Sequence, residues 1–267
     1  CLDLDGNLQW LRGLTHDFPN ASNSLGMASS PIVIGDTLIV QVENDAESFA
    51  TGLDTSNGKS RWKKVRPKKA NWTSPTSFQN GDAEPLALLQ SSAGIEAVDS
   101  HSGETVWKFG DGASTIPSSV VTGDSLLVPS NGLTALRLGE QLADDVKSPE
   151  VLWNDNRLAP GTASPIVVNG KVFVINRAGV LQAADVNTGS VLWKLRLKGP
   201  FSATPVAAGN HLIFFNEEGG AQVVDISGAE GAIVGENSVG ETILCTPAIA
   251  DNEMFVRSDG HLWKIAK

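Results

Sequence analysis

Apolar residues along the chain occur in short runs that Gly, Asn and Asp residues interrupt. Runs of this length predict β-strands, and no stretch shows the periodicity of a helix. Many runs come in pairs: a small residue and Pro lead into the first run, and a polar turn separates it from the second. We predict that each pair is a β-hairpin, with the Pro at a strand start, where a missing N–H costs least.

The Pro-led hairpin recurs six times along the chain, at steps of 40 to 46 residues between anchor positions. The third copy carries Ser119 in the place of Pro. The copies are SSPIVIGDTLIV (29–40), TSPTSFQNGDAEPLALL (73–89), SSVVTGDSLLV (118–128), ASPIVVNGKVFV (163–174), ATPVAAGNHLIFF (203–215) and CTPAIADNEMFV (245–256).

A second kind of hairpin alternates with these and has its own signature: a small residue, an Asp two positions later, a Gly turn and a closing Trp. The eleven-residue copies are GLDTSNGKSRW (52–62), AVDSHSGETVW (97–107) and AADVNTGSVLW (183–193). CLDLDGNLQW (1–10) is one residue shorter, ALRLGEQLADDVKSPEVLW (135–153) contains an insertion, and VVDISGAEGAIVGE (223–236) keeps Asp225 and Gly228 without a Trp. We expect the tryptophans to pack between neighbouring repeats, each burying a large aromatic surface. They are Trp10, Trp62, Trp107, Trp153 and Trp193.

Two hairpins in every 40 to 46 residues give four strands per repeat, which is the signature of a β-propeller blade. The sequence therefore predicts an all-β propeller of four-stranded antiparallel blades, with six blades visible and one domain over residues 1–267. The predicted blades are 28–62, 72–107, 115–153, 162–193, 202–236 and 244–267, the last together with 1–12. DGHLWKIAK (259–267) matches a third strand and LDGNLQW (4–10) a fourth, so the N-terminal strand would complete the sixth blade and remove an open edge.

The small-x-Asp…Gly-x-x-x-Trp unit resembles the tryptophan-docking repeat of PQQ-like, quinoprotein-type propellers, and within them the non-enzymatic BamB-like branch. The resemblance covers residues 1–267 and implies a parent of about eight blades. Residues 1–3 and 264–266 occupy equivalent places in the repeat, which favours a truncated chain over a closed ring of six. Both interpretations stay open.

The sequence carries few groups that suit a cofactor or a metal. PQQ-dependent dehydrogenases of the resembled family use a calcium-bound quinone, an Asp base and often a vicinal cysteine pair, whereas the only cysteines here are Cys1 and Cys245. Asp3 to Asn7 looks like the start of a calcium loop but lacks the terminal Glu, and we interpret it as a turn. No two histidines stand at metal-ligand spacing. We expect no catalytic residue, no metal and neither PQQ nor calcium.

Charge narrows the choice of partner. The formal net charge of -10 argues against nucleic acid, and no run of about 18 apolar residues could span a membrane. One stretch is basic, and it is either a solvated loop between blades or a docking patch for an acidic partner or an anionic surface. Its residues are Arg61, Lys63, Lys64, Arg66, Lys68 and Lys69. The insertion at 142–150 and the connector at 20–30 are the longest loops and could shape a rim.

Three functions compete. The leading one is a non-catalytic, monomeric scaffold that binds a protein partner in the bacterial cell envelope; its periplasmic or extracellular location is implied by the resemblance alone. The second is a small-molecule or sugar-binding enzyme, or a quinoprotein, that uses the central funnel. The hydroxyls that would line this funnel, unless they only cap strand starts, are Ser30, Ser74, Ser118, Ser164, Thr204 and Thr246. The third is an extracellular sensor domain of a larger receptor.

Overall fold

The computed structural model describes residues 1–21, 28–79, 81, 83–138 and 148–266. Strands dominate it, and the single described helix is α1 (Leu14–Asp17). The chain divides into two compact units, Cys1–Ser130 with Leu136–Glu150 and Asn131–Ala135 with Val151–Lys267. Each unit is described by itself, and the single domain over residues 1–267 stays a prediction.

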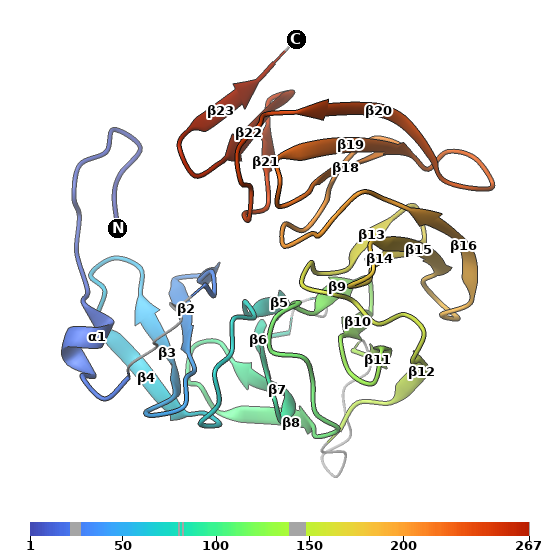
Figure 1. Cartoon of the computed structure of the whole chain (residues 1–267). Helices are drawn as coiled ribbons and strands as arrows, with labels where there is room; N and C mark the ends of the chain where they lie inside the picture. Colours follow the sequence, from blue (N-terminus) through green and yellow to red (C-terminus); the bar gives the residue numbers. More distant parts are fainter. Residues whose placement is uncertain (22–27, 80, 82, 139–147, 267) are drawn as a thin grey trace. The chain divides into compact units, whose positions relative to one another are not determined.

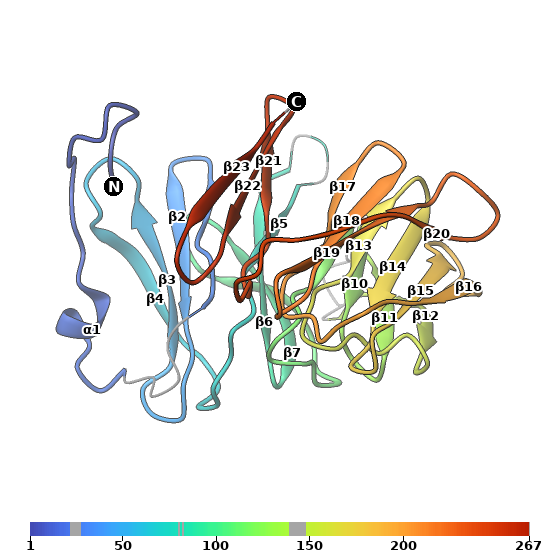
Figure 2. The same cartoon turned by 45° about the horizontal axis from the view of Figure 1, so that its top comes forward.

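The first unit contains two complete antiparallel sheets (Figure 1), each with its strands hydrogen-bonded in chain order. The first sheet comprises β1 (Ile32–Ile34), β2 (Thr37–Val42), β3 (Phe49–Asp54) and β4 (Ser60–Val65). The second comprises β5 (Thr76–Phe78), β6 (Leu86–Ser91), β7 (Gly94–Asp99) and β8 (Thr105–Phe109). The two sheets lie side by side in both views (Figure 2).

The boundary between the two units falls within the third sheet. It comprises β9 (Val120–Thr122), β10 (Ser125–Val128), β11 (Leu133–Arg137) and β12 (Val151–Asp155). Most of the predicted insertion, up to residue 147, lies outside the described residues, as does the greater part of the 20–30 connector.

The second unit contains the last three sheets. The fourth comprises β13 (Ile166–Val168), β14 (Lys171–Ile175), β15 (Val180–Asp185) and β16 (Val191–Arg196). The fifth comprises β17 (Val206–Ala208), β18 (His211–Phe215), β19 (Gly220–Asp225) and β20 (Ala232–Ser238). The sixth has three strands, β21 (Ala248–Ala250), β22 (Glu253–Arg257) and β23 (Leu262–Ile265).

The sixth sheet has three strands, and its completion by residues 1–12, which belong to the other unit, stays a prediction. Residues 1–10 form a turn of their own, closed by a bridge between Leu2 and Leu8. The short helix α1 was not predicted. It follows Gly13 in the connector before the first sheet, and Leu14 and Phe18 pack against buried Val42 and Phe49. The predicted all-β architecture of repeated antiparallel hairpins is confirmed.

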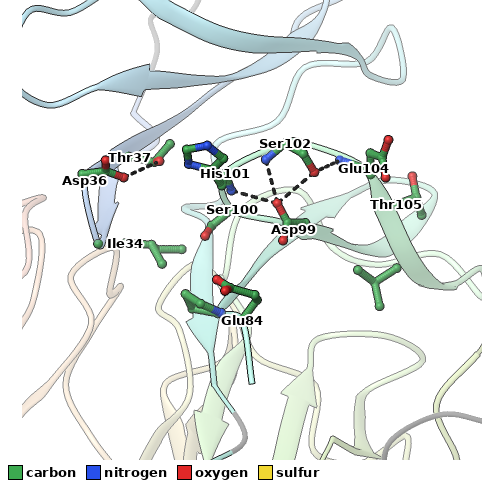
Figure 3. A pocket seen from close by; sticks show the side chains of 13 residues that line it. Ile34, Asp36, Thr37, Glu84, Asp99, Ser100, His101, Ser102, Glu104 and Thr105 are labelled. Carbon is green, nitrogen blue, oxygen red and sulfur yellow. Dashed lines mark hydrogen bonds between the residues drawn. The ribbon is translucent and has the colours of Figure 1, made fainter. Parts of the chain in front are cut away.

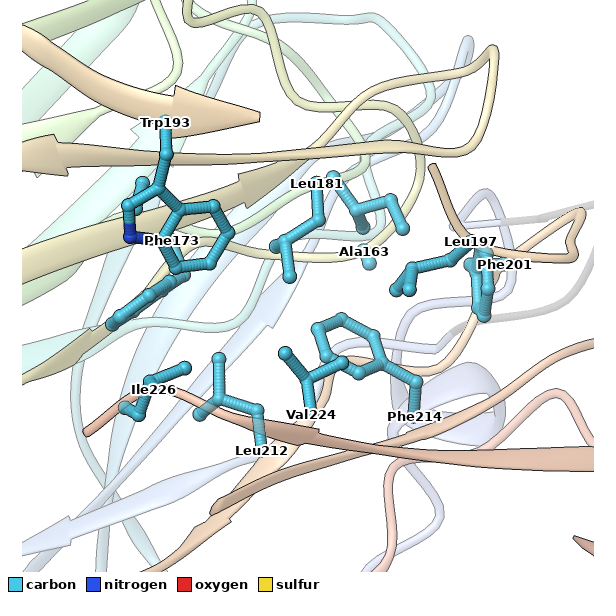
Figure 4. Packing of buried hydrophobic residues seen from close by; sticks show 12 residues of the cluster. Ala163, Phe173, Leu181, Trp193, Leu197, Phe201, Leu212, Phe214, Val224 and Ile226 are labelled. Atoms are coloured by element: carbon cyan, nitrogen blue, oxygen red, sulfur yellow. The ribbon is translucent and has the colours of Figure 1, made fainter. Parts of the chain in front are cut away.

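The hydrophobic core lies between successive sheets. Inner strands such as β3 and β7 are buried on both faces, whereas the fourth strand β4 has both buried and exposed positions. In the second unit, Phe173 and Trp193 of the fourth sheet pack with Leu212 and Val224 of the fifth (Figure 4). Because each sheet buries side chains against the next, packing of a blade depends on its neighbour.

Candidate functional site

The Asp–Gly turn of the repeat is a rigid, preformed element. In the second sheet the Asp99 carboxylate accepts the backbone N–H groups of His101 and Ser102 at 3.0 and 2.6 Å. Four residues after this Asp, Gly103 has a φ of +74°, a region that side chains disfavour. Asp54 with Gly58 and Asp185 with Gly189 repeat this arrangement. The Asp therefore fixes the turn, and the Gly gives it a flat surface.

A tryptophan of one sheet lies against the glycine of the next. A Cβ atom at Gly103 would lie 2.5 Å from the Trp62 ring, and Trp62 Nε1 donates to the carbonyl of Ser100 at 3.0 Å. Two further pairs repeat both contacts: Trp10 with Gly58 and Thr55 O at 2.8 Å, and Trp153 with Gly189 and Val186 O at 3.0 Å. The energetic role of these contacts stays a prediction.

Two tryptophans depart from this pattern. Trp193 faces Gly231, not the Gly228 that the sequence singles out, because the turn of the fifth sheet is longer. Its Nε1 has no hydrogen-bond partner among the described residues. Trp107 is buried, and Gly139, where the repeat places its glycine, lies outside the described residues.

The hydroxyls proposed to line a funnel connect neighbouring sheets, and the funnel role itself stays a prediction. In the first unit, Ser30 N donates to Ser74 Oγ at 2.9 Å, and Ser74 N donates to Ser118 Oγ at 3.0 Å. In the second unit, Ser164 N donates to Thr204 Oγ1 at 3.0 Å, and Thr204 N donates to Thr246 Oγ1 at 3.2 Å. Each acceptor hydroxyl caps the start of the preceding sheet, which is the simpler of the two roles expected for it.

Replacing Thr204 with Val should therefore lower the free energy of unfolding by about 1 kcal/mol, because the shape is kept while the Ser164 N–H loses its acceptor. Chemical denaturation followed by tryptophan fluorescence measures the change. Thr204→Ser keeps the hydroxyl and is the control. Equal losses in both variants would show that the threonine methyl group, not the hydrogen bond, matters.

Most of the basic stretch is neutralised within the chain. Arg61 pairs with Asp36 at 2.5 Å and with Asp54 at 2.7 Å. Lys63 pairs with Glu47 at 2.7 Å and lies 3.7 Å from the centre of the Phe18 ring. Lys64 approaches Glu96 at 3.5 Å, and Arg66 pairs with Glu43 and Glu96.

Arg66 is the centre of a buried charge cluster between the first two sheets. Its side chain is 2% exposed, and it contacts Glu43, which is 1% exposed, at 2.7 Å, and also Glu96. Burial raises the pKa of Glu43 despite Arg66 and Asn71, which both favour its charged form. Burial alone would also raise the pKa of Glu96, but Thr105, Arg66 and neighbouring lysines together lower it. This cluster is buried at the junction and is closed to a partner.

Lys68 and Lys69 are the remaining members of the stretch. Both are exposed, and neither has a side-chain ion pair in the described part of the chain. A docking role for these two stays a prediction, whereas the other four already bind carboxylates of this chain.

A pocket opens on the first unit where turns of the first and second sheets meet (Figure 3), with a volume of about 600 Å³. It is lined by the β1–β2 turn (34–37), by Glu84 and Pro85 before β6, and by the β7–β8 turn (99–102 and 104–106). The volume lies within the range of small-ligand sites, but the pocket is open and its walls are turns.

The pocket is acidic. Hydrogen bonds from Arg61 lower the pKa of Asp36, and turn hydrogen bonds from Ser102 and His101 outweigh burial and lower the pKa of Asp99. Glu84 and Glu104 are exposed at its edge, with no side-chain hydrogen bond or ion pair to the described residues. The pocket thus presents carboxylates that a cationic or N–H-rich group could meet.

The groups that could take part in acid–base or metal chemistry are few among the described side chains of this region. The ring nitrogen Nδ1 of His101 lies 3.0 Å from Nη1 of Arg61. The neighbour of this imidazole is therefore a guanidinium cation and not a nucleophilic side chain. Among residues that the structure describes, no group of three or more His, Cys, Asp or Glu could hold a metal ion. Cys1 and Cys245 are free. No described helix is long and apolar enough to cross a membrane.

Successive antiparallel meanders, with rigid Asp–Gly turns that receive a tryptophan at Gly58, Gly103 and Gly189, define a PQQ-like β-propeller. The family model described as "Outer membrane protein assembly factor BamB" matches residues 91–227 and 177–267, together about two-thirds of the chain. The chain belongs to this family.

Solved structures show the same fold. BamB from Moraxella catarrhalis is similar with a TM-score of 0.72 and 16% identity, over 97% of this chain and 75% of that one. BBS1N, solved in complex with ARL6DN, is similar with a TM-score of 0.61 and 16% identity, over 85% of this chain and 73% of that one. Comparison with curated proteins finds no sequence match.

Sequence reasoning missed the acidic pocket. Glu84 and Glu104 belong to turns without any motif, and they are 20 positions apart in the chain. A usable signal was present, since alternate turns of a four-stranded meander emerge at the same end of the sheet. Sorting the turns by end would have placed residues 34–37, 84–85, 99–102 and 104–106 together.

Proposed function

We propose that the chain is a non-catalytic scaffold that binds a protein partner in the bacterial cell envelope, in the periplasm or outside the cell. The observation that carries the proposal is the acidic pocket formed by turns of the first two sheets. The family description supports a role in the assembly of outer-membrane proteins. BBS1N, which shares the fold, was solved in complex with a second protein.

The turns that line the pocket suit protein recognition because they are ordered before a partner arrives. Asp99 holds its turn through two backbone N–H groups, and Arg61 holds Asp36. A preformed surface loses little conformational entropy on binding. Carboxylates at its edge would select a segment of opposite charge and speed its approach.

The proposal predicts that Glu84→Lys combined with Glu104→Lys will slow partner association on the order of tenfold at low salt, because the variant reverses the charge that steers a basic segment. A photo-crosslinking amino acid at position 104, introduced in the source cell, should trap one discrete partner. Because position 104 then carries the crosslinker, Glu84→Lys alone is added to this protein, and it should reduce that adduct.

The matched control reverses Asp5 and Asp111, two exposed carboxylates outside the pocket that have no ion pair in the described structure. A crosslinker at position 111 should give no such adduct, and Asp5→Lys with Asp111→Lys should leave the adduct at 104 intact. Identical adducts from positions 104 and 111, or none from 104, would contradict the proposal.

A further inference from the structure

At one position of the repeat, hydrogen bonding explains why one copy has a different residue type. The residue before the first strand is Pro31, Pro75, Pro165, Pro205 or Pro247 in five copies and Ser119 in the third. Ser119 N donates to Gln90 Oε1 at 2.7 Å. Proline has no N–H and could not make this bond. The exception therefore matches an amide side chain on the preceding sheet.

The strand registers identify the equivalents of Gln90. In the second sheet, the first residue of the first strand pairs with Leu88, and Gln90 lies two residues further along the second strand. The same count gives Gln41 in the first sheet, Ile175 in the fourth and Phe215 in the fifth. Ile175 and Phe215 need no hydrogen-bond partner, and their following sheets begin with Pro205 and Pro247. Gln41 is the mismatch, because it is an amide whose following sheet begins with Pro75.

The mismatch leaves a buried acceptor without a donor. Gln41 is 3% exposed, and its Nε2 donates to the carbonyl of Gln90 at 2.7 Å. Its Oε1 is buried and has no partner among the described residues. The same carbonyl of Gln90 also accepts from Asn71 Nδ2 at 2.9 Å and Thr73 Oγ1 at 3.3 Å, so the surroundings are polar. Polar sites of this kind hold buried water.

We propose that the junction of the first and second sheets binds one buried water molecule at Gln41 Oε1. The water donates one hydrogen bond to this oxygen, in the place that the Ser119 N–H takes at Gln90. It substitutes for the donor that Pro75 lacks. The second junction needs no such water at Gln90, since both atoms of that amide already have protein partners.

A crystal structure at a resolution that orders buried waters tests the site directly. We expect a water about 2.5–3.0 Å from Gln41 Oε1. In the Pro75→Ser variant the new N–H should replace it, and the water should be lost. A wild-type map that shows other buried waters but none on Gln41 Oε1 would overturn the proposal, as would a water that persists in Pro75→Ser.

A solution measurement provides a second, independent test. In wild type, the Gln41 side-chain NH2 should show a nuclear Overhauser effect to a long-lived water, and Pro75→Ser should abolish it. Pro205→Ser makes the same change where the preceding sheet presents Ile175, and it should leave the effect at Gln41 unchanged. Loss of the signal in both variants, or retention in both, would count against a site defined by Gln41 and Pro75.

Discussion

Replacing Arg66 with Ala should lower the free energy of unfolding by about 3–5 kcal/mol, which is the usual result of removing one partner of a buried charge pair. The Arg66 side chain is 2% exposed and lies between Glu43 and Glu96. Without it, Glu43 is a buried carboxylate with only Asn71 to accept from. Urea denaturation at neutral pH measures the loss.

An exposed ion pair is the matched control. Arg137 and Glu150 contact at 2.7 Å with 42% and 62% of their side chains exposed. Arg137→Ala should therefore change stability by less than about 1 kcal/mol. Adding Glu43→Gln to Arg66→Ala should recover part of the loss, because a neutral amide removes the unpaired charge. If the double variant is no more stable than Arg66→Ala, lost packing and not charge explains the effect.

The pH dependence follows from the opposite pKa directions of the two carboxylates. The pKa of Glu43 is raised above its ordinary value of 4.5, so between the two values the folded state holds a proton that the unfolded state has lost. Stability from this group falls as pH rises above 4.5. The pKa of Glu96 is lowered, so its contribution is present above 4.5 and is lost as pH falls below it. Glu43→Gln should remove only the first of these changes.

The sequence predicts the repeat well because the repeat rests on local rules. Pro at strand starts, Gly at positive φ and Asp two residues before a turn N–H each act within a few residues, and Asp99 with Gly103 is found as expected. The basic stretch was harder to interpret. Its partners Asp36 and Glu96 are 25 and 30 positions away from Arg61 and Arg66, and only the pairing of strands brings them together.

The candidate site escaped prediction for a related reason. No local sequence motif marks Glu84 or Glu104 as part of a site. They line one pocket because the turns of the first two sheets meet there. The N-terminal residues show the same limit, because a local pattern does not identify the strand that a segment pairs with. Residues 4–10 match the pattern of a fourth strand, but an isolated bridge between Leu2 and Leu8 is what the structure shows there, and completion of the sixth sheet stays a prediction.

The tryptophan contact between sheets should account for a comparable share of stability. Trp62→Ala should cost about 3–5 kcal/mol, the usual result for a large buried aromatic. Gly103→Ala adds two penalties: a side chain at φ +74°, about 1–2 kcal/mol, and a Cβ 2.5 Å from the Trp62 ring. Gly123 has a φ of +52° and nothing within 4 Å of such a Cβ, so Gly123→Ala carries the first penalty alone.

A double-mutant cycle isolates the contact between the two sheets. Gly103→Ala should be more destabilising than Gly123→Ala by about 1–3 kcal/mol in the wild-type background, because the ring must move. In the Trp62→Ala background this difference should vanish, since the atoms that the new Cβ meets are gone. If Gly103→Ala keeps its full cost without Trp62, the glycine serves only the turn that Asp99 fixes. The repeat would then join its blades through the Trp62–Ser100 hydrogen bond and the apolar core instead.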